Sequence, residues 1–149
     1  MPVRSVGSTL PDFYSARLRF DRGVRVRIRP LDDWVEALDS GRGTIVKVDV
    51  EGTEDEVLGS GKTFLATFRP DVLCEVLPDQ ADVEALDLAL RPLGYGLYRV
   101  ESDGVRPFER IEPDAEFRDW LFTPRTPDRL TDIGIPVLAE RKQRATQGN

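Results

Sequence analysis

The stretch from Ile45 to Val76, IVKVDVEGTEDEVLGSGKTFLATFRPDVLCEV, decides the fold of this chain. It opens with a β-branched, nearly all-apolar run over residues 44–50, which is typical of a strand buried on both faces. A stripe of apolar residues at helical spacing follows over residues 54–68, and a second apolar run covers residues 72–77. This alternation predicts a βαβ unit whose two strands are parallel and adjacent.

The same alternation continues towards the C-terminus. Residues 80–93 carry a second helical stripe that ends before Gly94, and residues 95–100 read as a third strand. Residues 117–123 predict a fourth strand that closes the sheet as an antiparallel partner. The expected fold class is therefore α/β with a mostly parallel sheet.

Before the deciding stretch, arginines alternate with apolar residues over 16–20 and 24–29, around the turn signal Asp21-Arg22-Gly23. This pattern predicts a β-hairpin with its arginines on one face, either as a solvated edge or as an anion-binding surface. The chain then divides into an arm with a hairpin (1–30), an α/β domain (31–124) and a partly disordered tail (125–149).

Acidic residues stand where the predicted strands end. Asp49 and Glu51 follow the first strand and Glu75 ends the second, so all three lie at the carboxyl edge of the sheet, where open α/β sheets bind ligands. They could act as a general base, as metal ligands or as hydrogen-bond acceptors. The structural alternative is that Asp49 and Glu51 cap the next helix. Glu54 is expected to be an uninvolved residue of that helix.

A second motif, GSGKT at residues 59–63, resembles the end of a phosphate-binding loop. The full pattern needs glycine where Glu56 stands, and the motif interrupts a helix instead of opening one after a strand. We therefore expect a weakened helix surface with Lys62 exposed.

Composition excludes several classes of function. With 149 residues, a net charge of -6 and no stretch of about 20 apolar residues, neither a nucleic-acid partner nor a membrane span is expected. The absence of histidine excludes His-based triads and His metal ligands, and no metal is expected. The single cysteine, Cys74, lies in an apolar run, as in a reduced cytoplasmic protein.

The stretch Lys47-Val48-Asp49-Val50-Glu51-Gly52-Thr53-Glu54, followed by Val57-Leu58, resembles the hallmark of the FkbM-type S-adenosylmethionine-dependent methyltransferases. Leu31-Asp32-Asp33, Leu93-Gly94-Tyr95 and Leu121–Pro124 are similar to other segments of that family. The resemblance implies a Rossmann-like class I methyltransferase sheet with an antiparallel last strand. It also implies transfer of a methyl group to a hydroxyl of a small molecule or sugar. Its implied roles are catalysis for Asp49 and Glu51, S-adenosylmethionine binding for Asp32, Asp49 and Gly52, and substrate binding for Glu75.

One part of the family pattern has no counterpart in residues 1–30. The glycine-rich loop that cradles the cofactor, roughly D-x-G-A-N-x-G, is not found there, so the sheet is expected to be truncated on its N-terminal side. The strand at residues 44–50 would then have an exposed edge, covered either by the N-terminal hairpin or by a second copy in a homo-oligomer. The rival to an enzyme is a non-catalytic remnant of the fold that binds a protein partner.

Overall fold

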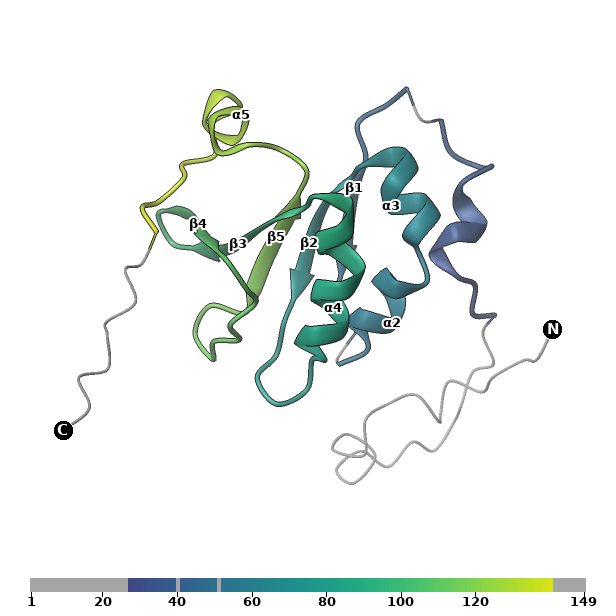
Figure 1. The fold of residues 1–149 in the computed structure, drawn as a ribbon, viewed down its shortest axis with the longest axis horizontal. Coiled ribbons are helices and arrows are strands. Elements are labelled where there is room, and N and C mark those ends of the chain that lie inside the picture. The colour runs from purple at the N-terminus through teal and green to yellow at the C-terminus, as the bar shows by residue number, and fades with distance from the viewer. Residues whose placement is uncertain (1–26, 40, 51, 141–149) are drawn as a thin grey trace.

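The structure, a computed structural model, describes residues 27–39, 41–50 and 52–140. Its centre is a five-stranded sheet in the order β1-β2-β5-β3-β4 (Figure 1). The strands are β1 (Ile45–Val48), β2 (Asp71–Glu75), β3 (Gly96–Glu101), β4 (Gly104–Phe108) and β5 (Asp119–Thr123). The three apolar runs that predict strands at 44–50, 72–77 and 95–100 thus lie in one sheet, as expected.

Strand directions match the prediction only in part. β1 and β2 are parallel and adjacent, with Val48 opposite Cys74. The other three pairs of neighbouring strands are antiparallel. The expectation of a mostly parallel sheet is therefore wrong for the pairing of the strands. The reason is that β5 inserts between β2 and β3 instead of closing the edge, and that β4 folds back on β3 as a hairpin through a turn at Ser102 and Asp103.

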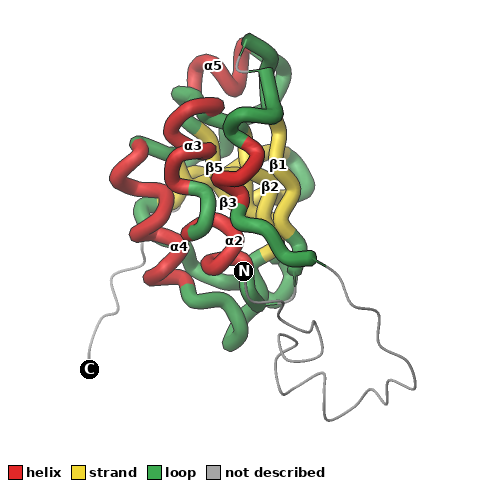
Figure 2. The backbone as a smooth tube through the Cα atoms, turned by 90° about the vertical axis from the view of Figure 1, so that its right-hand side faces the viewer, coloured by secondary structure: helices red, strands yellow, loops and turns green. Residues whose placement is uncertain are grey.

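The helices between residues 54 and 90 lie on one side of the strands (Figure 2). A single helix over residues 54–68 is a wrong prediction, because the chain forms α2 (Glu54–Gly59) and α3 (Lys62–Phe68) instead. The break follows from close packing: a Cβ on Gly61 would lie 2.6 Å from Cδ2 of Leu31 in the short 3-10 helix η2 (Leu31–Trp34). The GSGKT segment is therefore a helix interruption, and Lys62 is exposed.

The second helical stripe forms α4 (Val83–Leu90) and the short 3-10 helix η3 (Arg91–Leu93), with Asp82 Oδ1 capping α4 through the N–H of Ala85 at 3.0 Å. Gly94 follows in the left-handed region (φ 71°), where glycine is favoured. The main core lies between these helices and the sheet. Its fully buried side chains include Leu58, Leu65, Val72, Cys74, Leu86, Leu90, Trp120 and Phe122.

The last described segment carries an element that the sequence did not reveal. Helix α5 (Pro127–Asp132) lies within the predicted tail, and its Leu130 is buried with Tyr98 and Val105 in a second, smaller core. Of the predicted N-terminal hairpin, residues 16–26 lie outside the described residues. Residues 27–29 are described and are not in a strand, which corrects the end of the predicted range.

Candidate functional site

Asp49 directly follows β1 and is exposed at the carboxyl end of the strand. Lys47 Nζ donates a hydrogen bond to Asp49 Oδ2 at 2.7 Å, and both side chains face solvent. This hydrogen bond and the charge of Asp49 raise the pKa of Lys47. Asp49 is therefore held in place by one partner while its carboxylate stays accessible.

Glu75 ends the neighbouring parallel strand, so it lies at the same edge of the sheet as Asp49. Its cross-strand partner is Asp119, the first residue of β5. The charges of Asp119 and Glu75 also raise the pKa of Lys47. The structure thus brings together two of the predicted acids around one lysine, and adds Asp119. Sequence reasoning missed Asp119 because the position of β5 beside β2 is a tertiary feature.

The thiol of Cys74 lies beneath this group of acids. Its burial, more than any other effect, raises the pKa of Cys74. The negative charges of Glu54, Asp119, Asp49 and Glu75 raise it further. With its pKa raised in this way, the thiol stays protonated at neutral pH.

Glu54 is the residue whose role sequence reasoning got wrong. Only 1% of it is exposed, so it is not the uninvolved helix residue expected. Its Oε1 accepts hydrogen bonds from the N–H of Val50 at 3.3 Å and of Gly52 at 3.1 Å, and its Oε2 also lies 3.1 Å from the Gly52 nitrogen. A signal was present: Leu58, on the apolar stripe, lies four residues on, so both residues share the buried face of α2.

The loop after β1 is shaped by these contacts. Gly52 has a φ of 95°, which a residue with a side chain rarely adopts. Its N–H is turned to Glu54, so the loop closes over a buried carboxylate. Glu51, predicted to be catalytic, lies outside the described residues.

Asp32 has a structural task away from this loop. Its Oδ1 accepts a hydrogen bond from the N–H of Phe64 at 2.8 Å, at the first turn of α3. Burial by itself raises the pKa of Asp32, but hydrogen bonds from Phe64 and Thr63 outweigh it, so the pKa is lowered. The carboxylate is thus engaged as a helix cap between η2 and α3.

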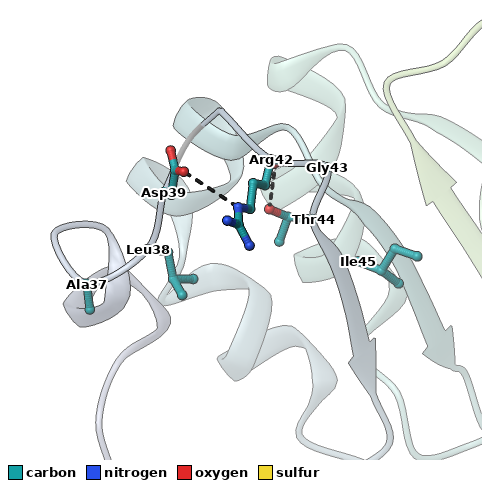
Figure 3. Close-up of a pocket in the computed structure, with 7 residues that line it drawn as sticks. All are labelled: Ala37, Leu38, Asp39, Arg42, Gly43, Thr44 and Ile45. Carbon is teal, nitrogen blue, oxygen red and sulfur yellow. Dashed lines mark hydrogen bonds and ion pairs between the residues drawn. The ribbon is translucent and has the colours of Figure 1, made fainter.

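A shallow hollow of about 470 Å³ lies beside the start of β1 (Figure 3). Arg42 lines it, with its Nε 3.7 Å from Asp39 Oδ2, and Thr44 donates to the Arg42 carbonyl at 3.4 Å. Asp49 stands at the opposite end of β1, so this hollow is separate from the acids Asp49, Glu75 and Asp119 around Lys47.

The sequence profile of the methyltransferase FkbM domain matches residues 5–97, well over half of the chain. The chain belongs to this family. No curated protein and no solved structure matches it. The match includes the whole motif from Lys47 to Leu58, so Lys47, Asp49 and Glu54 lie in the segment that carries the resemblance, whereas Asp119 lies beyond the matched residues.

The described residues contain neither a group of candidate metal ligands nor a membrane-spanning helix. No three acidic or cysteine side chains among them are placed to hold a metal ion. None of the helices that the structure describes is both long and apolar enough to cross a bilayer.

The residues expected to hold S-adenosylmethionine fit that task unequally. Asp49 fits, because its exposed carboxylate can accept hydrogen bonds from an amine or a ribose hydroxyl. Asp32 already accepts a hydrogen bond from Phe64 through Oδ1, and the Gly52 N–H is donated to Glu54. Within the described part of the FkbM domain, Asp49 is thus the predicted cofactor residue whose carboxylate is exposed and bound only by a side chain that faces solvent.

Proposed function

We propose that this FkbM domain is an S-adenosylmethionine-dependent O-methyltransferase acting on a hydroxyl of a small molecule or sugar, in the cytoplasm. The observation that supports the proposal is that two acids of one motif have different positions and roles. Asp49 is exposed at the carboxyl end of β1, whereas Glu54 is buried and holds the intervening loop closed. A motif that served folding alone would not require an exposed acid at the carboxyl end of β1.

The described residues support a simple chemical role. S-adenosylmethionine, when bound, supplies a methyl group activated by its sulfonium charge. Asp49 accepts the proton of the acceptor hydroxyl, as a positioned general base. Lys47 holds one carboxylate oxygen at 2.7 Å, which orients the other oxygen. Glu75 lies on the neighbouring strand end and is the proposed contact for further hydroxyls of the acceptor.

The test is methyl incorporation. The full chain is incubated with S-adenosylmethionine carrying a radiolabelled methyl group and with panels of sugars and small hydroxylated molecules. Label transferred to an acceptor supports the proposal. Equal label transfer by Asp49→Asn and the wild type would show that Asp49 is not the general base. The absence of label with every acceptor, together with no cofactor-dependent rise in melting temperature, would favour the second candidate.

That second candidate is a non-catalytic FkbM domain that binds a protein partner. It is favoured by one specific observation, the exposed outer side of β1 among the described residues. The two candidates differ in whether the cofactor stabilises the folded protein. A cofactor present at a hundred times its Kd raises the free energy of unfolding of a protein that binds it by about 2.7 kcal/mol. A domain that has lost the cofactor shows no such shift.

A further inference from the structure

Arg99, in the middle of β3, is a cation buried on the face of the sheet that carries the main core. Only 4% of it is exposed. Leu97, two residues before it, belongs to the main core, whereas Tyr98 lies in the second core on the other face. Lys47 alternates with Val48 of the main core, so it projects from that other face as well. Arg99 is therefore separate from Lys47 and the acids around it.

Partners on the sheet hold one side of the Arg99 guanidinium. Its Nη2 donates a hydrogen bond to Glu101 Oε1 at 2.8 Å, and the centre of the Phe108 ring lies 4.6 Å from its Cζ. Glu101 is held in turn by Arg106 through hydrogen bonds of 2.9 and 2.8 Å. All of these residues belong to the paired strands β3 and β4, so the strand pairing fixes this side.

A loop supplies the other side of the guanidinium. Residues 109–118 join β4 to β5 without regular secondary structure (Figure 1). Arg99 Nη1 donates to Asp114 Oδ2 at 3.3 Å, and the centre of the Phe117 ring lies 5.5 Å from Cζ. Asp114 Oδ1 also accepts hydrogen bonds from the N–H groups of Glu116 and Phe117, at 2.9 and 3.2 Å. The loop thus closes on Arg99 through contacts that are longer than those from the sheet.

Arg99 has a donor that the described residues do not use. Its Nε is buried and has no hydrogen-bond partner among them, and the same is true of Nε1 of Trp120. Trp120 is the neighbour of Arg99 across the strand pair β3 and β5, and its ring packs against that of Phe108 at 5.3 Å. Both atoms carry an N–H, so a group that satisfies either of them must be an acceptor.

Charge decides which kind of acceptor fits beside Arg99. The positive charges of Arg99 and Arg106 face the negative charges of Glu101 and Asp114, so this cluster is neutral. If the loop moves away with Asp114, one buried positive charge is left without compensation, which is strongly unfavourable. A neutral hydroxyl or amide oxygen does not replace that charge. A carboxylate does, and it forms charge-assisted hydrogen bonds with a guanidinium.

We propose that Arg99 is a binding site for a small carboxylic acid and that Asp114 occupies this site in the closed state of the loop. The carboxylate of the ligand takes the place of Asp114 at Nη1, and the unpaired Nε is a further donor for its oxygens. The side chain of Asp114 is already 34% exposed, so it can move into water when it is displaced. Binding therefore releases residues 109–118 from the sheet, and this release does not depend on methyl transfer.

The first experiment is chemical rescue of the full-length Asp114→Ala variant, with sodium acetate as the probe and sodium chloride at equal ionic strength as the reference. In chloride, the melting temperature of Asp114→Ala should fall by about 5–10 °C, because a buried charge loses its partner. Acetate should restore at least half of this loss, and the neutral isostere acetamide should restore none. Glu112→Ala is the matched control, since it removes only an exposed ion pair from the same loop. Its response to each solute is subtracted.

The second experiment uses the wild type and needs no variant to fold. Acetate should speed hydrogen–deuterium exchange at the amides of Glu116 and Phe117 by about 3-fold or more relative to chloride, since it binds the open loop. The amides of β3 should be unchanged. Equal exchange of the two loop amides in acetate and chloride would overturn the proposal. So would rescue of Asp114→Ala by acetamide as well as by acetate, or a failure of acetate to rescue it beyond the Glu112→Ala control.

Discussion

Both carboxylate oxygens of Glu54 lie 3.1 Å from the backbone nitrogen of Gly52. This contact ties the start of α2 back onto the loop that follows β1, and the N–H of Val50 adds a further hydrogen bond to Oε1. Glu54 is therefore the residue of the motif that shapes the loop, while Asp49 is the one presented to solvent.

Glu54→Gln should lower the free energy of unfolding by about 1–3 kcal/mol. The amide keeps the size of the side chain, but one of its two acceptors becomes a donor that faces the N–H of Gly52. Urea denaturation measures the loss. Glu56→Gln, two residues on and exposed, is the matched control and should change stability by less than about 0.5 kcal/mol. Equal stability of the two variants would contradict the role assigned to Glu54.

Asp32→Ala should cost about 1 kcal/mol, the usual value of a helix cap, because the N–H of Phe64 loses its acceptor. Asp33→Ala, its neighbour, removes only an exposed ion pair with Arg29 and should cost no more than about 0.5 kcal/mol. Thermal and chemical unfolding compare the two. A change in cofactor affinity without a change in stability would instead return Asp32 to the ligand-binding role that the family resemblance implies.

Acid stability should depend on Glu101 in β3. Its carboxylate accepts hydrogen bonds from Arg106 at 2.8 and 2.9 Å and from Arg99 at 2.8 Å. The hydrogen bonds from Arg106 contribute most, outweigh the effect of burial and, with those from Arg99, lower the pKa of Glu101 from 4.5 to about 2. The stabilisation is therefore fully present above pH 4.5 and is lost as the pH falls from there towards 2.

Glu101→Gln should accordingly lower the free energy of unfolding at pH 7 by an amount on the order of 2–4 kcal/mol and flatten its decline below pH 4.5. Glu112→Gln is the control, since its ion pair with Arg110 is exposed and 3.6 Å long. Urea titrations at several pH values between 2 and 7 give both curves. Parallel curves for Glu101→Gln and the wild type would show that this carboxylate does not carry the acid dependence.

Asp49→Asn should lower the rate of any methyl transfer by ~10²–10⁴-fold, the usual contribution of a positioned base. The melting temperature should barely move, because the ion pair with Lys47 is exposed. Glu51→Gln is predicted to lower the rate similarly, from the sequence motif alone. Asp103→Asn, in the exposed turn between β3 and β4, serves as the control. An unchanged rate of methyl transfer in Asp49→Asn would show that Asp49 has no catalytic role beyond its ion pair with Lys47.

The full chain should bind S-adenosylmethionine weakly by itself, so the methyl-transfer assay needs the cofactor in large excess. Of the three residues expected to contact the cofactor, Asp49 is bound only by the exposed Lys47, while Asp32 and Gly52 hydrogen-bond to the loops and helices that they join. Isothermal titration calorimetry measures the affinity directly. A low-micromolar Kd would contradict this expectation and would mean that residues outside the described part complete the binding site.

Some of the site could be predicted from the sequence because it depends on neighbouring residues. The β-branched run before Asp49 and the apolar run before Glu75 mark two strand ends, and parallel pairing brings the ends of such strands to one edge. Glu54 could have been placed on the buried face by its spacing to Leu58. The charge of Glu54, however, favours an exposed position. Its burial is favourable because the N–H groups of Val50 and Gly52 donate hydrogen bonds to the carboxylate.

The sequence by itself determined the local units of this protein: the parallel pair β1 and β2, the helical stripes between them, the last strand and the motif of the FkbM family. The tertiary structure decided where those units lie. β5 inserts between β2 and β3 and so brings Asp119 beside Glu75, and Gly61 packs against Leu31 and so divides one helix into two. Periodicity reports which face of a segment is buried, but strand order and close packing depend on residues far apart in the chain, whose pairing no local pattern encodes.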